Sequence, residues 1–394
     1  MSEPLNEDEL SSLVKEAVTT GTPLEVRGGG TKRAIGRPVE AKQGMTTRGL
    51  AGIVDYDPTE LVITALAGTP VHEVQAALAA RSQQFAFEPR DLRALLGANG
   101  DETLGGLVCA NLSGPRRFAA GGVRDHLLGF RAVSGRGEIF KSGGRVVKNV
   151  TGYDLSKLVV GSFGTLAILS EVTLRVTPRP AETGTLIVSG REIDRFAATL
   201  DVASGAGALT GGAYLTAGAR VDFPHLAGTR QATIAVRFEG DTAIAAANAA
   251  RKRLGPADTD VLETDASTEL WAAIRDLAPL LGSDGNIWRV SLRRTAIAAF
   301  VESLDLPEGA PLMVDWVGGQ IWFAEPQGID VRARLHAAAG PDGHATVIRA
   351  ADHRPTETSV FHPQSPAVAA LSRRIKHHFD PKGILNPGRL YADY

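Results

Sequence analysis

Apolar positions recur with the spacing of helices and strands along most of the chain. Four apolar residues share one face of a helix predicted over 6–20. An almost unbroken apolar run predicts a buried strand over 59–67, which a Thr-Pro pair separates from a helix running through residue 80. Strict alternation over 171–176 predicts a strand with apolar residues on one face and polar residues on the other. Residues 124–140 predict a hairpin around a Gly-rich turn.

The pattern changes at Pro178 and Pro180. Beyond them, Ala-rich helical patterns alternate with short strand patterns, which is typical of a separate α+β domain. The predicted strands of this region cover 185–189, 233–238, 312–317 and 345–349, and its predicted helices cover 241–254 and 331–339.

A last helix is predicted over 366–379, with Ser365 as its N-cap. Four of its apolar residues face one way: Val368, Leu371, Ile375 and Phe379. The tail over 383–391 is irregular but apolar, so we expect it to pack back on the body of the protein.

Composition and charge narrow the class of protein. With 394 residues, 43% of them hydrophobic, the chain is predicted to be globular with two domains. The net charge of −2 offers no argument for a nucleic acid or an anionic membrane as a partner. The single cysteine, Cys109, excludes an internal disulfide. The absence of a long apolar run and the acidic N-terminal residues predict a cytoplasmic protein, which meets the inner face of a membrane only through partner chains.

Residues 27–32, Arg-Gly-Gly-Gly-Thr-Lys, follow a predicted strand. Successive glycines can turn their backbone N–H groups into one concavity, and a hydroxyl with two flanking cations suits a pyrophosphate. A flexible surface turn is the alternative. The chain has no Walker P-loop and no Gly-x-Gly-x-x-Gly that opens a helix after a strand, so the common nucleotide-binding motifs are excluded.

Two further segments are dense in glycine. Residues 104–114 can receive a flat apolar ring, with Asn111 and Ser113 as polar contacts, and a helix start packed tightly in the core is the alternative. Residues 143–165 combine many glycines with small or hydroxylated residues and lead into a regular strand. Glycine lets backbone approach another backbone or a ligand closely, so this segment is predicted to be a wall around a bound molecule.

In this order, the three segments resemble the FAD domain of the vanillyl-alcohol oxidase/p-cresol methylhydroxylase (PCMH) superfamily. Residues 55–58 and 61–70 resemble the strand, turn and helix that follow the pyrophosphate loop there, and 379–389 resemble the C-terminal return to the flavin. The resemblance implies an α+β protein, with a PCMH-type two-part FAD-binding domain and a reduced α+β cap domain. The expected parts are the FAD-binding domain over 1–178, the cap over 179–360, and a C-terminal helix and tail over 361–394 that return to the FAD domain.

Within this superfamily, four segments are similar to the FAD-binding E subunits of glycolate oxidases: 113–117, 123–125, 148–154 and 343–346. That family implies a subunit of a 2-hydroxyacid dehydrogenase complex. In such a complex glycolate is oxidised to glyoxylate by hydride transfer from its α-carbon to the flavin, and the electrons pass to an iron–sulfur subunit. The implied partners are a catalytic-type FAD subunit and the iron–sulfur subunit, and the implied ligand is a small 2-hydroxyacid.

The resemblance also implies roles for individual residues. Those expected to hold the pyrophosphate are Arg27, Gly28, Gly29, Gly30, Thr31 and Lys32. Those expected to line the flavin and its ribityl chain are Thr69, Gly105, Gly106, Asn111, Ser113 and Gly114. Those expected along the cofactor towards the adenine are Gly152, Tyr153, Gly161, Thr165 and Ile168, and those expected to approach the isoalloxazine are Asn386 and Arg389.

The histidines do not form a metal-binding pattern. Related metal-dependent dehydrogenases carry a His-x-His cluster, which this chain lacks. His377 and His378 are adjacent on a predicted helix, so they point in different directions. We therefore predict no metal site. The pyrophosphate loop has no histidine to link a flavin, and Cys109 is expected to be a buried small side chain, so FAD is predicted to bind non-covalently.

Three functions stay open at this point. As a complex subunit, the chain either oxidises the substrate itself or holds an FAD that relays electrons or supports the complex, and no catalytic residue is identified. A stand-alone FAD oxidase or dehydrogenase of another alcohol or 2-hydroxyacid would need a base such as Tyr153, His344 or His353. A cofactor-free assembly subunit would tolerate a bulky residue at Gly29, whereas an FAD-binding chain would not.

Overall fold

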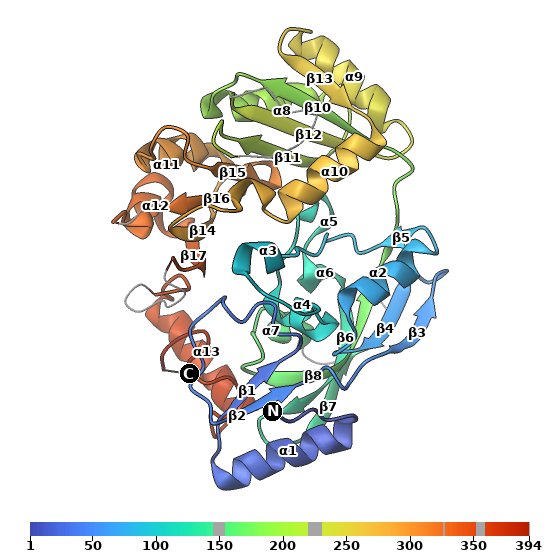
Figure 1. Ribbon diagram of the computed structural model, residues 1–394, viewed down its shortest axis with the longest axis vertical. Coiled ribbons are helices and arrows are strands. Elements are labelled where there is room, and N and C mark those ends of the chain that lie inside the picture. Colours follow the sequence, from blue (N-terminus) through green and yellow to red (C-terminus); the bar gives the residue numbers. More distant parts are fainter. Residues whose placement is uncertain (145–153, 220–230, 326–327, 352–358, 394) are drawn as a thin grey trace.

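The computed structural model has two stacked halves (Figure 1). It describes residues 1–144, 154–219, 231–325, 328–351 and 359–393. The lower half of Figure 1 contains both chain ends, the elements from α1 (Glu7–Thr20) to β9 (Thr177–Pro178), and the C-terminal helix α13 (Pro366–Phe379). The upper half contains the elements between β9 and α13.

A five-stranded antiparallel sheet forms the centre of the lower half. In spatial order its strands are β3 (Ile53–Asp57), β4 (Val62–Leu66), β8 (Ala167–Arg175), β6 (Leu127–Ser134) and β7 (Ile139–Gly143). Two small pairs accompany it: β1 (Leu24–Arg27) parallel to β2 (Gln43–Thr46), and β5 (Gln83–Gln84) antiparallel to β9. The other helices of this half are α2 (Val71–Ala79), α3 (Arg93–Leu96), α4 (Leu104–Ala110), α5 (Arg117–Ala120), α6 (Val123–His126) and α7 (Ser156–Val159).

The elements predicted in this half are confirmed, except that the hairpin predicted over 124–140 begins at Leu127, because residues 123–126 form α6. The helix predicted over 6–20 is α1, where Asn6 accepts a hydrogen bond from the Glu9 backbone N–H and caps the helix. The apolar run over 59–67 contains the buried strand β4. The alternation over 171–176 lies in β8, although Thr173 on its polar face is buried as well, since it shares a hydrogen bond with Thr64.

An eight-stranded antiparallel sheet forms the upper half. In spatial order its strands are β13 (Thr259–Leu262), β10 (Thr183–Ser189), β12 (Thr233–Glu239), β11 (Leu209–Leu215), β15 (Leu312–Asp315), β16 (Gln320–Glu325), β14 (Asn286–Ser291) and β17 (His344–Arg349). Its α-helices are α8 (Phe196–Ser204), α9 (Ala243–Leu254), α10 (Thr264–Arg275), α11 (Ile297–Ser303) and α12 (Val331–Ala339). The predicted elements are confirmed, except that the strand predicted over 312–317 ends at Asp315, because the next two residues form a turn with positive φ.

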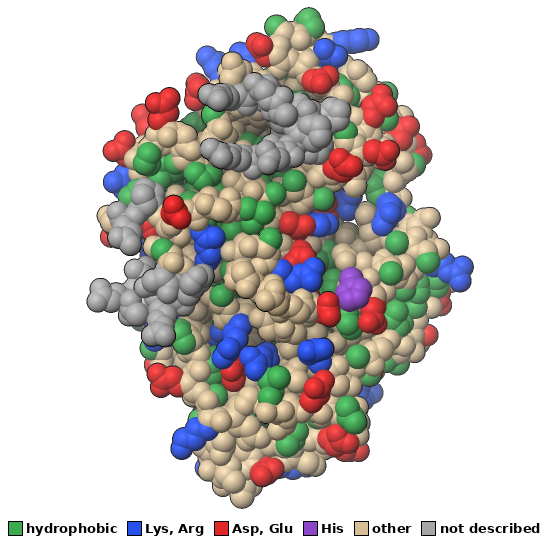
Figure 2. Space-filling model, in the orientation of Figure 1, with side chains coloured by type: hydrophobic (Ala, Val, Ile, Leu, Met, Phe, Trp, Pro, Cys, Tyr) green, Lys and Arg blue, Asp and Glu red, His purple; other side chains and the backbone are tan. Residues whose placement is uncertain are grey.

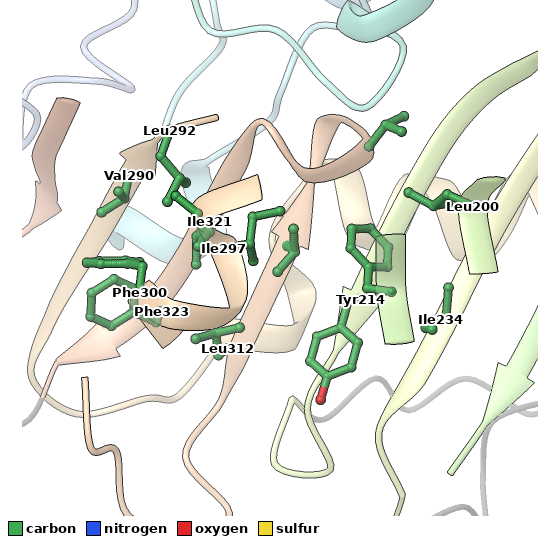
Figure 3. Close-up of a cluster of buried hydrophobic side chains, with 14 of the residues drawn as sticks. Leu200, Tyr214, Ile234, Val290, Leu292, Ile297, Phe300, Leu312, Ile321 and Phe323 are labelled. Atoms are coloured by element: carbon green, nitrogen blue, oxygen red, sulfur yellow. The ribbon is translucent and has the colours of Figure 1, made fainter. Parts of the chain in front are cut away.

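The two faces of this sheet bury different side chains. One face carries Trp288 and Val290 and packs against α8, α9, α11 and α12. Figure 3 shows this layer, in which the rings of Phe300 and Phe323 lie with their centroids 6.3 Å apart. Side chains alternate along a strand, so every second residue points to the other face of the sheet. This second face packs against α10 and the lower half.

Buried ion pairs join the two halves. Glu88 of the lower half accepts two hydrogen bonds from Arg237 of β12, and Arg116 lies on the same carboxylate. Arg90, which is fully buried, pairs with Asp315 at the end of β15. Burial raises the pKa of Asp315, although the Arg90 charge acts in the opposite direction. These ion pairs favour a single arrangement of the two halves, because separating the halves would leave buried charges without partners, which is strongly unfavourable.

The C-terminal tail returns to the first strand of the chain. Leu385 forms a parallel bridge with Leu24 of β1, and Ile384 is buried in the same cluster. The expectation that the apolar tail packs back on the protein is therefore confirmed.

Helix α13 occupies its predicted range but contacts the protein through an unexpected side. Within it only Lys376 is buried, and its ammonium group donates to Thr165 O, Leu385 O and the Asp380 carboxylate. Two of the four apolar residues predicted to share one face remain open: Val368 is 49% exposed and Leu371 is 54% exposed. The helix is attached by this buried polar anchor together with Phe379, whose ring packs near Phe140.

Candidate functional site

A cleft in the lower half is lined by the end of β1, the loop after it, α4, residues 163–169 and the C-terminal tail. We call this cleft the cradle. It brings together most of the residues predicted to bind a cofactor: Arg27, Gly28, Gly29, Gly30, Thr31, Lys32, Gly105, Gly106, Ile168, Asn386 and Arg389. Lys and Arg side chains gather near the middle of the face shown in Figure 2.

The loop after β1 needs glycine in order to pack. A Cβ atom on Gly28 would lie 1.9 Å from Thr103 Oγ1, and one on Gly29 would lie 1.7 Å from Asp101 O. Gly30 has a φ of 78°, which non-glycine residues rarely adopt. The loop is therefore closely packed backbone, and this argues against the alternative of a flexible surface turn.

This loop offers unpaired donors to the cradle. In the described part of the chain, the backbone N–H groups of Gly29, Gly30 and Thr31 have no hydrogen-bond partner. Lys32, by contrast, pairs with Glu102, whose pKa is raised by burial. The capacity to bind an anion therefore resides mainly in the backbone N–H groups, as in an anion nest, and less in the lysine.

Helix α4 borders the cradle with its first turn. Thr103 caps it by accepting a hydrogen bond from a backbone N–H, and a Cβ on Gly105 would lie 2.8 Å from the Ala67 side chain. At the other end Asn111 has a φ of 53°, and its buried Oδ1 has no hydrogen-bond partner. Asn111 itself lies just beyond Ala110, the last residue of α4 that lines the cradle. A buried acceptor without a donor is unfavourable, so a bound molecule with a donor would fit beside Asn111.

Three residues predicted to line the flavin have other roles. The Thr69 hydroxyl donates to Leu66 O at 2.7 Å and lies outside the cradle lining. Ser113 and Gly114 lie where the two halves meet: Ser113 O accepts from the Arg90 side chain, and Gly114 O accepts from Trp316 Nε1.

The residues predicted towards the adenine are only partly described. Gly161 lies beside Asn111, and the Thr165 hydroxyl donates to a backbone carbonyl, so neither lines the cradle. Gly152 and Tyr153 lie outside the described residues.

The two tail residues reach the cradle but use their polar groups on the backbone. Asn386 bonds both backbone groups of Val26 and donates to Phe163 O at 2.9 Å. The Arg389 guanidinium donates to the carbonyls of Lys32, Arg33 and Arg37, and burial lowers its pKa to about 10. Both residues line the cradle and hold its walls in place through these hydrogen bonds.

Several cradle residues were not predicted as ligand contacts. Phe163 and Gly164 line it, and both have positive φ, at 51° and 71°. The glycine density of their segment points to Gly164, but no sequence signal identifies Phe163. Cys109 also lines the cradle, and burial raises the pKa of its thiol to about 11.

The sheet of the upper half presents unmatched donors to the lower half. Arg289 lies opposite Trp322 in the β14–β16 ladder, with no carboxylate partner among the described residues. Burial and the neighbouring charges of Arg117 and Arg90 lower the pKa of Arg289 to about 10. The nearby Gln320 accepts from Trp322 Nε1, whereas its own buried Nε2 has no partner. Two unmatched donors on one face suit an anionic ligand.

The histidines are dispersed in the structure as well. Within the described ranges, no group of three or more His, Cys, Asp and Glu side chains is placed to hold a metal ion. His344, at the exposed start of β17, contacts the His362 ring at a centroid distance of 5.0 Å, while His353 lies outside the described residues. No helix in the described part of the chain is long and apolar enough to cross a bilayer.

Comparison with known proteins gives consistent relatives. Residues 2–143 match the FAD binding domain model, and residues 361–390 match the model of FAD linked oxidases, C-terminal domain. The glycolate oxidase subunit GlcE of Escherichia coli is 34% identical over 385 residues, which are 96% of each chain. The glycolate oxidase subunit GlcD of Bacillus subtilis is 29% identical over 50% of this chain and 41% of its own length. A D-lactate dehydrogenase of Archaeoglobus fulgidus is 34% identical over 45% of this chain and 38% of its own.

A solved structure shows the same fold. Alkyldihydroxyacetonephosphate synthase superposes with a TM-score of 0.66 over 98% of this chain and 75% of that chain, at 16% identity. With the FAD binding domain match, this likeness confirms the predicted PCMH-type α+β fold.

Proposed function

This chain belongs to the family of FAD-linked oxidases that includes the E. coli glycolate oxidase subunit GlcE, and we propose that it is an FAD-binding subunit of a complex that oxidises a small 2-hydroxyacid. FAD is its cofactor. The proposed substrate is glycolate, which becomes glyoxylate, and the proposed electron acceptor is an iron–sulfur partner chain. We place this complex in the cytoplasm, with any membrane contact made by the partners.

The cradle fits FAD on the observations of this structure. The unpaired N–H groups of Gly29, Gly30 and Thr31 suit a pyrophosphate, and the unpaired Asn111 Oδ1 suits a donor further along the cofactor. No histidine lines the cradle among the described residues, and Cys109 is kept as a neutral thiol, so we propose non-covalent binding. Bound flavin supplies the capacity to accept two electrons from the carbon that bears the substrate hydroxyl.

The unmatched donors of the upper sheet support an anionic substrate. Ala110 and Phe163 of the cradle belong to the same hydrophobic cluster as Trp322, the cross-strand neighbour of Arg289. We propose that Arg289 and Gln320 bind the carboxylate of the 2-hydroxyacid. A carboxylate there would offset the repulsion that Arg289 experiences from Arg117 and Arg90, and would give Gln320 Nε2 an acceptor.

The single observation that carries the proposal is the glycine loop, and Gly29→Ala tests it. Its Cβ would overlap Asp101 O, so we expect FAD affinity to fall about ten- to a hundredfold, as for an overpacked site. Gly44→Ala is the matched control, since a Cβ on this β2 glycine meets nothing closer than 3.6 Å. Flavin absorbance per chain after purification measures the effect. A wild-type chain that folds but does not retain or bind FAD would contradict the proposal.

Arg289→Met tests the substrate part separately. We expect it to retain FAD and to raise the KM for glycolate in the complex about tenfold or more, because a charge-assisted contact is lost. Reduction of the flavin by glycolate in the isolated chain would assign the oxidation to this subunit. A flavin present at 1:1 that glycolate does not reduce would assign it a relay or supporting role.

A further inference from the structure

A groove separate from the cradle runs along α13 on the lower half. Its floor is apolar and comes from β7, the α7 region and α13: Phe140, Leu155, Leu158, Leu371, Ile375 and Phe379. The groove encloses about 970 Å³. Continuing from its floor, α13 exposes Val368 and Leu371 to about half of their area. Contiguous apolar surface of this kind marks an interaction site more often than a scattered exposed residue does.

The rim of this groove is basic. Arg136, Arg373 and Arg374 line it together with His377 and His378, and Glu138 is the one acid among its described lining residues. Arg373 is matched by Asp393, whereas Arg136 and Arg374 have no carboxylate partner in the described part of the chain. The whole chain has a net charge of −2, so this positive charge is a local excess at the groove.

The way α13 is attached explains why part of this surface is free. Lys376 fixes the C-terminal half of the helix through Asp380 and two backbone carbonyls. In the same half, the ring of Phe379 lies with its centroid 6.0 Å from that of Phe140. Val368 and Leu371, nearer the start of the helix, are left about half exposed.

We propose that this groove is the docking site for an amphipathic helix of a partner chain, with an apolar ridge flanked by carboxylates. This inference rests on the proposed function as a subunit of a complex. A helix ridge with apolar residues at every third or fourth position fills a recessed apolar floor, and Asp or Glu on its flanks meets Arg136 and Arg374. The recessed part of the groove, at Phe140 and Phe379, favours a protein segment over a bilayer, because a flat membrane surface does not enter a hollow.

Site-specific photo-crosslinking in the native host tests this proposal on the full chain. A benzophenone amino acid replaces Leu371 in one variant and Val54 in the other, and the crosslinked peptides are mapped by mass spectrometry. Val54 on the edge strand β3 is the matched control, since both side chains are 54% exposed. We expect position 371, but not position 54, to crosslink to one other protein, within a helical segment that carries acidic flanks.

Charge reversal gives the second readout. The double variant Arg136→Glu, Arg374→Glu is expected to lower the crosslink yield at position 371 about tenfold, because like charges across an interface repel. Lys252→Glu, on the exposed side of α9, is expected to leave it unchanged. Flavin content should stay at the wild-type level in all variants, which separates a failure of this inference from a failure of FAD binding.

Four results would overturn the proposal. They are a crosslink from position 371 to lipid, a crosslink to a second copy of this chain, a crosslink within the same chain, and the absence of any crosslink. A yield that charge reversal leaves unchanged would equally refute the acidic character of the partner helix.

Discussion

Glu88 forms the ion pairs that join the two halves, and its replacement should show how much this junction contributes to the stability of the protein. Its carboxylate accepts from Arg237 Nη1 at 2.8 Å and Nη2 at 3.0 Å, and from the Arg116 backbone N–H at 2.6 Å. Burial by itself would raise its pKa, but the charges of Arg237 and Arg116 hold it down, from an ordinary value of 4.5 to about 2. Glu88→Gln keeps the size of the side chain and removes its charge.

The lowered pKa of Glu88 sets the expected change in the free energy of unfolding. Lowering it from 4.5 to about 2 corresponds to roughly 3 kcal/mol of folding free energy at neutral pH. The folded pKa lies below the unfolded one, so this stability is fully present above about pH 4.5 and is lost as the pH falls towards 2. Glu88→Gln should therefore lower the free energy of unfolding by roughly 3 kcal/mol near pH 7, and by less than half of that near pH 3.

Urea unfolding, followed by tryptophan fluorescence, measures this difference at both pH values. Glu60→Gln is the control, because it makes the same chemical change at an exposed side chain. With excess FAD, the flavin signal should be lost at lower urea in Glu88→Gln than in the wild type, because the less stable chain unfolds and releases its cofactor earlier. An equal loss of stability at both pH values, or a loss no larger than that of the control, would refute the electrostatic reasoning.

Three further predictions follow from buried polar contacts. Asn386→Gly keeps the positive φ but removes three hydrogen bonds to Val26 and Phe163, so FAD affinity, measured by titration, should fall about tenfold. An unchanged affinity would contradict a positioning role for Asn386. Arg90→Met leaves the Asp315 carboxylate buried without its cation and should lower the free energy of unfolding by roughly 3–5 kcal/mol in urea melts, and adding Asp315→Asn should recover part of that loss. Cys109, with a pKa of about 11, should react with iodoacetamide at pH 8 roughly a hundredfold more slowly than a free thiol. Bound FAD should slow this reaction further, and a rate that does not change with FAD would place the thiol away from the cofactor.

Local patterns in the sequence were sufficient to predict most helices and strands and one wall of the cradle. The alternation in β8 and the apolar face of α1 are encoded within a few residues, because side-chain periodicity follows directly from backbone geometry. The glycines of 28–30 were likewise readable, since only glycine tolerates the close backbone approach seen there. The PCMH-type fold and FAD as cofactor were predicted correctly from such segments in their order.

The partner of each polar group was decided only by the tertiary structure. Asn386 and Val26 are 360 positions apart, so nothing local distinguishes a residue that supports the cradle wall from one that approaches a ring. The ion pair of Lys32 with Glu102, and the lack of a carboxylate beside Arg289, depend on segments distant in the sequence. The apolar stripe of α13 was visible in the sequence, but the exposure of Val368 and Leu371 was not, because it depends on how the buried Lys376 anchors the helix. Periodicity and backbone sterics are properties of adjacent residues, whereas burial and charge matching depend on segments that the folded chain brings together.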